Sequence, residues 1–275
     1  MIGQAKRLFE LQHHTAAEQG KTSTPVITFA SGKGGTGKSF LAQNIALTIS
    51  RQGAKVLLVD MDFNLSSLHL MFNITPGNSI YSFLTGKVLF DEIIVNYSEN
   101  LHLIFGASGK LDHPLIDNFV INSLLEQLRS TAHLYDFILI DSSSGIGENI
   151  LALLLGSDQI IIVSTTEPTS VMDAYVILKL LKHNNCHAEN FVLVNRAMSE
   201  DDGETAYQNI KNATEHFLKI TPGYMGLVEN SQDVSRSIIK QIPFVECFPE
   251  SNLCRRIFNI SNIFVKNKQV ANNSL

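Results

Sequence analysis

The sequence predicts an α/β protein with a doubly wound, mainly parallel sheet flanked by helices. Short apolar runs, rich in Val, Ile, Leu and Phe, alternate with longer segments of helical spacing. The runs are nearly continuous in apolar character, which is typical of strands buried on both faces of a sheet. Strands alternating with helices imply right-handed crossovers. The expected strands are 26–30, 55–59, 101–105, 137–140, 159–163, 191–194 and 224–228.

The segments between these runs carry the spacing of amphipathic helices. In the first of them, 39–52, Leu41, Ile45 and Ile49 follow one another at intervals of four residues and form one stripe. The same reasoning predicts helices at 115–133, 168–183, 201–219, 231–241 and 252–265.

The last predicted helix allows two interpretations. Leu253, Ile257, Ile260 and Phe264 form an apolar stripe with basic residues around it, as in a helix that lies on a membrane surface. We favour a core helix, because the segment directly follows 249–251 and no apolar run comes after it.

Composition limits the class of protein. Hydrophobic residues make up 44% of the 275 residues, enough for a sizeable core, and the net charge is −5. This mildly acidic balance argues against broad nucleic-acid coating, so we expect no nucleic-acid partner. Cys186, Cys247 and Cys254 form no C-x-x-C pair, which predicts reduced thiols and no zinc or iron–sulfur site. Without an apolar signal segment or a spanning run, we expect a cytoplasmic protein.

Residues 32–39, GKGGTGKS, match the phosphate-binding pattern G-x-x-x-x-G-K-[ST]. An expected strand precedes the pattern and an expected helix follows it, so backbone N–H groups and the helix N-terminus would converge on one anion. Lys38 would reach the β- and γ-phosphates of a nucleotide, and the Ser39 hydroxyl would bind Mg²⁺. We expect the nucleotide contacts to include Gly34, Gly35, Thr36, Gly37, Lys38, Ser39 and Phe40.

Three carboxylates follow expected strands. Asp60 and Asp62 lie one residue apart, so strand alternation puts both on the same side near the carboxyl end of the sheet. Asp141 ends the strand that begins near residue 137. Each alone could be a strand-end cap, but three beside a phosphate loop favour a functional site.

The loop sequence KGGTGKS, residues 33–39, resembles the deviant Walker A loop of the MinD/ParA family, within the SIMIBI class of P-loop NTPases. Residues 136–141 resemble the family's Walker B strand, 165–175 its T-x-E-P-T-x-x-x-D-A-Y segment, and 192–196 its strand ending in Asn. The pattern before the last helix, with Pro243, Pro249 and Ser251, also matches. The resemblance covers about residues 25–265 and implies an ATPase that uses ATP and Mg²⁺.

The resemblance assigns roles to individual residues. It implies that Lys33 crosses a homodimer interface to the partner's nucleotide, where its charge substitutes for an arginine finger. Asp62 would orient the attacking water, while Asp60 and Asp141 would support Mg²⁺ together with Ser39. Asn195 would read adenine, with Arg196 beside it. Ser142–Ser144 replace the usual residues of switch II, the segment that contacts the γ-phosphate in the family.

The N-terminus points to one branch of the family. Gln4, Ala5 and Leu8 match the D-Q-A-x-x-L-R motif of the flagellar-number regulators, the FlhG group (also called FleN or YlxH). Gly3 and Phe9 depart from that motif, and a start with a few helix formers is the alternative. The resemblance implies that residues 2–9 bind an FlhF-type GTPase. It also allows flagellar basal-body proteins or transcription factors as partners.

Several interpretations of function stay open. The leading hypothesis is a switch ATPase that dimerises with ATP and regulates flagellar number or placement. The alternatives are a MinD-like division-site ATPase, a ParA-like partitioning ATPase, and a nucleotide-locked binding module without hydrolysis. An iron–sulfur carrier on this scaffold would need paired cysteines, which the chain lacks. A transient place at the inner membrane or the cell pole is compatible with the resemblance but has no support in the residues.

The chain divides into three predicted parts. Residues 1–24 would be an activation motif with a flexible linker, 25–266 a MinD-like ATPase domain, and 267–275 a disordered tail.

Overall fold

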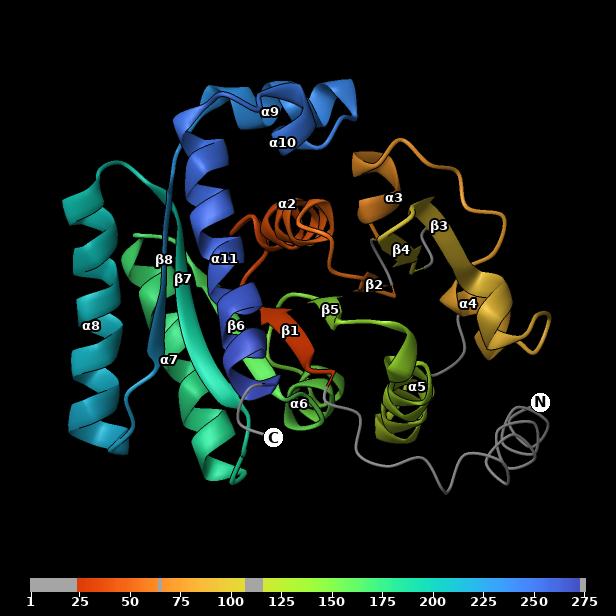
Figure 1. Ribbon diagram of the computed structural model, residues 1–275. Coiled ribbons are helices and arrows are strands. Elements are labelled where there is room, and N and C mark those ends of the chain that lie inside the picture. The colour runs from red at the N-terminus through yellow and green to blue at the C-terminus, as the bar shows by residue number, and fades with distance from the viewer. Residues whose placement is uncertain (1–23, 64–65, 107–115, 273–275) are drawn as a thin grey trace.

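The computed structural model describes residues 24–63, 66–106 and 116–272, with side chains to residue 266. Its centre is an eight-stranded sheet in the order β3-β4-β2-β5-β1-β6-β7-β8 (Figure 1). The strands are β1 Val26–Ala30, β2 Val56–Met61, β3 Ile94–Ser98, β4 Leu101–Ile104, β5 Phe137–Ser142, β6 Gln159–Ser164, β7 Glu189–Ala197 and β8 Gly223–Glu229. All pairings are parallel except that of β3 with β4, so the predicted fold class is confirmed.

Helices cover both faces of the sheet (Figure 1). The core between α2, α11 and one face is separate from two clusters on the other face, where α5 to α8 pack. The α-helices are α2 Lys38–Arg51, α3 Leu68–Met71, α4 Ile80–Leu84, α5 Asn118–Ser130, α6 Glu148–Leu155, α7 Pro168–His183, α8 Glu200–Leu218, α9 Gln232–Lys240, α10 Phe244–Cys247 and α11 Asn252–Asn272, and the 3₁₀ turns are η2 Phe90–Ile93 and η3 Ala132–Leu134.

The central strands are buried on both faces, as their apolar runs predict. Every residue of β1, β2 and β5 is buried, and their side chains alternate between the clusters on the two faces. This alternation fixes the register of the sheet and brings the carboxyl ends of β1, β2 and β5 to one edge. The first phosphate-loop residue and the predicted carboxylates therefore meet there.

The last helix settles one prediction and changes another. Leu253, Ile257, Ile260 and Phe264 are buried against α2 and β8, so α11 is a core helix over this stretch. The helix continues to Asn272, so most of the segment 267–275, expected to be disordered, is helical in backbone.

The first described residue, Thr24, lies one residue before the predicted start of the ATPase domain at residue 25. Thr24 is buried, and its hydroxyl donates to the carbonyl oxygens of Ala132 (2.9 Å) and Tyr135 (2.7 Å).

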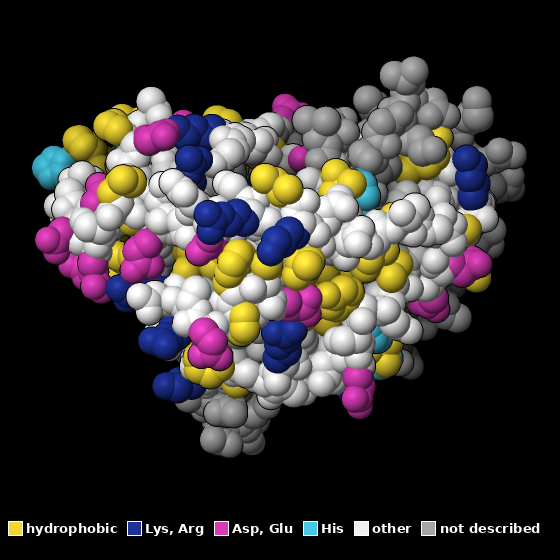
Figure 2. Space-filling model, turned by 90° about the horizontal axis from the view of Figure 1, so that it is seen from above, with side chains coloured by type: hydrophobic (Ala, Val, Ile, Leu, Met, Phe, Trp, Pro, Cys, Tyr) yellow, Lys and Arg dark blue, Asp and Glu magenta, His cyan; other side chains and the backbone are white. Residues whose placement is uncertain are grey.

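The surface is mixed in character. Figure 2 shows Asp and Glu side chains gathered toward the side where α8 lies, and Lys and Arg side chains interspersed with hydrophobic ones elsewhere on this face. The first turn of α8 carries Glu200, Asp201 and Asp202, and α9 exposes Ile239. Over the described residues, no helix is both long and apolar enough to cross a membrane.

Candidate nucleotide site

The phosphate loop connects β1 to α2, and two of its glycines adopt backbone angles that favour glycine. Gly35 has φ +81° and Gly37 φ +85°, both in the left-handed region. A Cβ on Gly37 would also lie 2.2 Å from Nδ2 of Asn195. The sequence therefore places glycine where the chain must turn sharply and where another side chain approaches the backbone.

Lys38 lies at the start of α2 and is buried, with 8% of its side chain exposed. Its Nζ donates to the Asp141 carboxylate at the end of β5 and to the Ser142 carbonyl oxygen. Asp141 has only 2% of its side chain exposed. A buried ammonium next to a buried carboxylate is stable only as a pair, because either charge alone would have lost its hydration without compensation.

Asp60 lies directly across from Asp141, since the two residues are register partners on β2 and β5. Burial and the charge of Asp141 raise the pKa of Asp60 to about 7. Hydrogen bonds act in the opposite direction: Asp60 accepts from the Ser66 hydroxyl at 2.7 Å and from the backbone N–H of Asp62 at 3.0 Å. No motif in the sequence marks Ser66 as part of this site.

The donor set at this edge suits Mg²⁺. Ser39 lies one residue after Lys38, and the carboxylates of Asp60 and Asp141 occupy adjacent strands. Within the described ranges, no group of three or more His, Cys, Asp or Glu side chains could hold a metal. One hydroxyl and two carboxylates fit a hard cation that keeps most of its water, which is how Mg²⁺ binds beside nucleotide phosphates.

Asn195 and Arg196 reach the phosphate loop from the end of β7. Asn195 is buried, and its Nδ2 donates to the Thr36 carbonyl oxygen at 2.7 Å. Arg196 has φ +59° at a register shift between β7 and β8, and its guanidinium donates to the Gly35 carbonyl oxygen at 3.1 Å. The bulge is thus what turns two consecutive side chains toward one loop.

Lys33 is held within its own chain. Its Nζ donates to the Glu167 carboxylate and to the Thr169 hydroxyl at 3.0 Å. The hydrogen bond and charge of Lys33 lower the pKa of Glu167. Two thirds of the Lys33 side chain is nonetheless buried, with 33% exposed. Glu167 and Thr169 lie in the segment 165–175 that resembles the family's T-x-E-P-T pattern, but no local pattern predicts their contact with Lys33.

The serines after Asp141 tie neighbouring strands together. Ser142 Oγ donates to the Phe29 carbonyl oxygen at 2.8 Å, and Ser143 Oγ donates to that of Met61 at 3.3 Å. In the same turn, Gly145 N–H donates to the Ser31 carbonyl oxygen at 2.8 Å. The turn after β5 is therefore fixed to the ends of β1 and β2, next to the loop that would hold phosphate.

The remaining predicted residues differ in what they offer. Phe40 is buried and packs edge-on against Phe244, with ring centroids 5.7 Å apart, so its side chain belongs to the core and only its backbone could approach a nucleotide. Gly34 is exposed in the loop, and Asp62 is half-buried beside Asp60. At the start of the loop, a Cβ on Gly32 would lie 2.4 Å from that of Asp173.

This arrangement defines a P-loop nucleotide-binding protein with a second lysine in its loop. Its marks are a buried lysine, a glycine-rich turn before a helix, and two carboxylates at the ends of adjacent strands. Comparison with known proteins agrees. A family model described as an AAA domain matches residues 24–193. The chain therefore belongs to this family, in its MinD/ParA group of P-loop ATPases with a deviant Walker A loop.

Curated relatives match over most of the chain. It is 26% identical to the antiactivator FleN of Pseudomonas aeruginosa, over 82% of this chain and 81% of FleN. It is 28% identical to the flagellum site-determining protein YlxH of Helicobacter pylori, over 96% of this chain and 91% of YlxH.

A solved structure of similar fold is the septum site-determining protein MinD of Pyrococcus horikoshii OT3 in complex with Mg-ADP. It has a TM-score of 0.72 and 25% identity over 86% of this chain and 94% of that chain. A plasmid partition protein of Borrelia burgdorferi has a TM-score of 0.63 and 25% identity over 89% of this chain and 99% of that chain.

Proposed function

We propose that this protein is a switch ATPase that dimerises with ATP and regulates flagellar number or placement through an FlhF-type GTPase. The observation that carries the proposal is similarity to both FleN and YlxH over more than four fifths of each protein, on a chain that keeps a P-loop site. YlxH is named as a flagellum site-determining protein, and FleN is named as an antiactivator.

The site residues support ATP binding and hydrolysis with Mg²⁺. Lys38 would leave Asp141 for the β- and γ-phosphates, which offer it a stronger counter-charge. Ser39, Asp60 and Asp141 would hold the cation, which supplies charge neutralisation at the phosphates. Asp62 would then orient the attacking water from the end of β2.

Dimerisation would require Lys33 to change partners. In the isolated chain its ammonium is held by Glu167 and Thr169. In the proposed dimer it would reach the phosphates bound to the second protomer, where its charge acts as an arginine finger does. ATP would favour the dimer only if it binds that state more tightly than the monomer.

The GTPase partner would bind through residues 2–9, which lie outside the described part of the chain. We expect the purified protein to stimulate GTP hydrolysis by an FlhF-type GTPase, and deletion of residues 2–9 to remove that stimulation. Full stimulation by the truncated protein would reject the role assigned to this segment.

MinD-like relatives give the second candidate. This chain is 30% identical to the septum site-determining protein MinD of Synechocystis, over 64% of this chain and 65% of that MinD. Absence of any effect on the GTPase, with ATP-dependent dimerisation retained, would favour such a role.

A further inference from the structure

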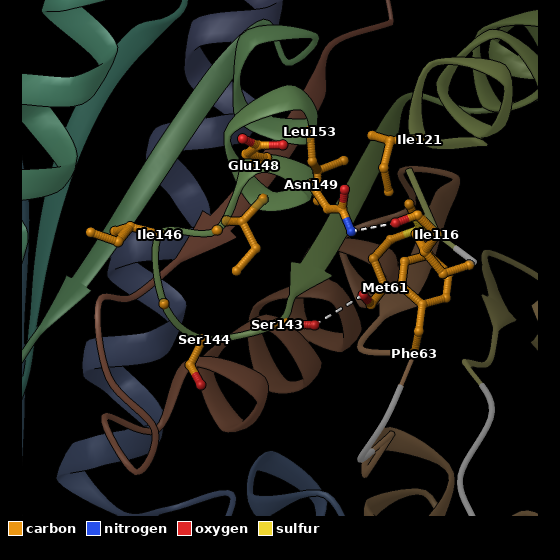
Figure 3. Close-up of a pocket in the computed structure, with 13 residues that line it drawn as sticks. Met61, Phe63, Ile116, Ile121, Ser143, Ser144, Ile146, Glu148, Asn149 and Leu153 are labelled. Atoms are coloured by element: carbon orange, nitrogen blue, oxygen red, sulfur yellow. Dashed lines mark hydrogen bonds between the residues drawn. The ribbon is translucent and has the colours of Figure 1, made fainter. Parts of the chain in front are cut away.

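A cavity of about 740 Å³ lies beside the proposed switch II segment and the end of β2, and the chemistry described above does not use it. Figure 3 shows its walls, which come from the end of β2, the turn after β5, α6 and the approach to α5. We call it the switch groove. Its lining residues are Met61, Phe63, Ile116, Ile121, Ser143, Ser144, Gly145, Ile146, Gly147, Glu148, Asn149, Ile150 and Leu153.

The switch groove is mainly apolar and bears one negative charge. Among its described lining residues, Glu148 is the only charged one, and it is exposed at the start of α6. Ile146 leaves 48% of its surface exposed although it lines an apolar hollow. Such a groove suits a short apolar segment that carries a cation beside its apolar residues.

Hydrogen bonds fix the groove to the nucleotide site. Asn149 Nδ2 donates to the Ile116 carbonyl oxygen at 2.6 Å, which closes one wall, and Ser143 Oγ donates to that of Met61 at 3.3 Å (Figure 3). Met61 directly precedes Asp62, and Ser143 follows Asp141 by two residues. A segment bound here would therefore contact the chain next to the proposed catalytic Asp62 and next to the proposed magnesium ligand Asp141.

The chain itself contains a segment with the required chemistry. Residues 2–9 read IGQAKRLF, with Leu8 and Phe9 directly after Lys6 and Arg7. The apolar pair matches the groove wall, and the two cations match Glu148. We propose that residues 2–9 dock within their own chain into the switch groove.

The tether has the length that this docking requires. Thr24 is anchored to Ala132 and Tyr135, just past the end of α5, whereas Ile116 and Ile121 lie at its beginning. The span is thus roughly the length of α5, about 20 Å for a helix of this size. The 14 residues 10–23 between segment and anchor are mostly polar, and a flexible chain of that length would have an r.m.s. extension of about 20 Å as well.

A matched tether makes weak docking sufficient. When the linker extension equals the span, the effective concentration of the tethered segment reaches the order of millimolar. A segment with millimolar affinity would then fill the groove about half of the time. While docked, residues 2–9 would be unavailable to any other protein, so the groove would compete with a partner for them.

Cross-linking of the full chain tests the docking. In a background with Cys186, Cys247 and Cys254 changed to Ser, Glu10→Cys is combined with either Ser144→Cys at the groove or Leu134→Cys beside the Thr24 anchor. Leu134 is 51% exposed and Ser144 is also exposed. A short bis-maleimide is added, and thermal melts confirm that both variants fold.

Docking predicts that the Ser144 pair cross-links about tenfold faster than the Leu134 pair, as a product of monomer mass. An undocked tether gives the reverse order, because its segment visits the region near its own anchor most often, and that result would overturn the proposal. A product of dimer mass would also overturn it, since the segment would then occupy a second copy. Adding Leu8→Ser and Phe9→Ser should remove the advantage of the Ser144 pair. A rate that these two changes leave intact would exclude apolar docking. None of these outcomes depends on ATP hydrolysis or on a flagellar partner.

Discussion

Three ionisable side chains, those of Lys38, Asp60 and Asp141, lie buried together at the carboxyl ends of β2 and β5. Lys38 neutralises Asp141, and this leaves Asp60 next to a carboxylate that already has its counter-charge. Asp60 is 1% exposed and relies on hydrogen bonds from Ser66 and Asp62. The site therefore holds one carboxyl group whose ionisation is unfavourable, and a bound cation would favour its ionised form.

The raised pKa of Asp60 predicts how stability depends on pH. Its pKa is about 7 in the folded chain against 3.8 as an ordinary carboxyl. Between these values the folded state binds more protons than the unfolded state, so the free energy of unfolding falls as pH rises. We expect a fall on the order of 1–3 kcal/mol from this group between about pH 4 and pH 7.

Urea unfolding in EDTA at a series of pH values measures this. Asp60→Asn should flatten the decline, because the group no longer titrates. An identical pH profile for the two proteins would contradict the assignment to Asp60.

Lys38→Ala should abolish nucleotide binding, because the phosphates lose their main counter-charge. It should also destabilise the chain by about 3 kcal/mol, since Asp141 would remain buried without its partner. The double variant Lys38→Ala with Asp141→Asn separates the two effects: it should regain part of the stability and none of the binding. Calorimetry with ATP and thermal melts provide the measurements, and unchanged affinity in either variant would exclude this phosphate site.

The phosphate loop depends on glycine for its backbone angle and for the close approach of Asn195, and one pair of variants can separate these two effects. Gly37 has φ +85° and lies against Asn195, whereas Gly53, in the turn after α2, has φ +90° and no atom of the described chain within 4 Å of where a Cβ would lie. Both Gly→Ala changes should cost about 1 kcal/mol of unfolding free energy from backbone strain. Only Gly37→Ala should also displace Asn195 and weaken nucleotide binding. Equal binding by the two variants, measured by calorimetry, would mean that the contact with Asn195 does not matter.

Most of the sheet could be predicted from the sequence because its strands are buried on both faces. The seven runs expected from apolar character correspond to seven of the eight strands. The eighth, β3, is an antiparallel edge strand whose residues are half-buried or exposed, so it lacks the continuous apolar pattern. Helix α6 was also not anticipated, because residues 150–155 form a short apolar run that periodicity cannot distinguish from a buried strand.

The site could be predicted only as far as local pattern extends. The loop motif and the strand-end carboxylates lie in continuous sequence, so Lys38, Asp60 and Asp141 were identified and lie together. The contacts of Lys33 with Glu167 and of Asp173 with Gly32 join residues more than 130 positions apart. No local spacing encodes such pairs, because they depend on how β1 and β6 align in the sheet.

At the scale of the whole molecule, the proposed dimer makes Asp62 and Lys33 separable. Asp62→Ala should leave ATP binding intact and prevent orientation of the attacking water, so ATP would accumulate in the closed state. We expect light scattering to give a persistent dimer with ATP for this variant, and a transient one for the unchanged chain. A monomer with ATP would contradict both the dimer and the role of Asp62.

Lys33→Ala tests whether Lys33 acts on the nucleotide of the second protomer or on that of its own chain. In the monomer, Lys33 contacts Glu167 and Thr169. Lys38 is the lysine that pairs with Asp141 at the proposed phosphate site. Removal of Lys33 should therefore leave nucleotide affinity of the monomer within about twofold, because Lys38 and not Lys33 supplies the main counter-charge to the phosphates. Hydrolysis should fall by at least about a hundredfold if Lys33 supplies the charge that an arginine finger supplies elsewhere. Lys87→Ala, a charge removal beside Tyr81 on α4, is the matched control and should change neither quantity. If calorimetry and phosphate release instead give equal losses of binding and hydrolysis for Lys33→Ala, the lysine acts on the nucleotide of its own chain, and the dimer is not needed to explain its presence in the loop.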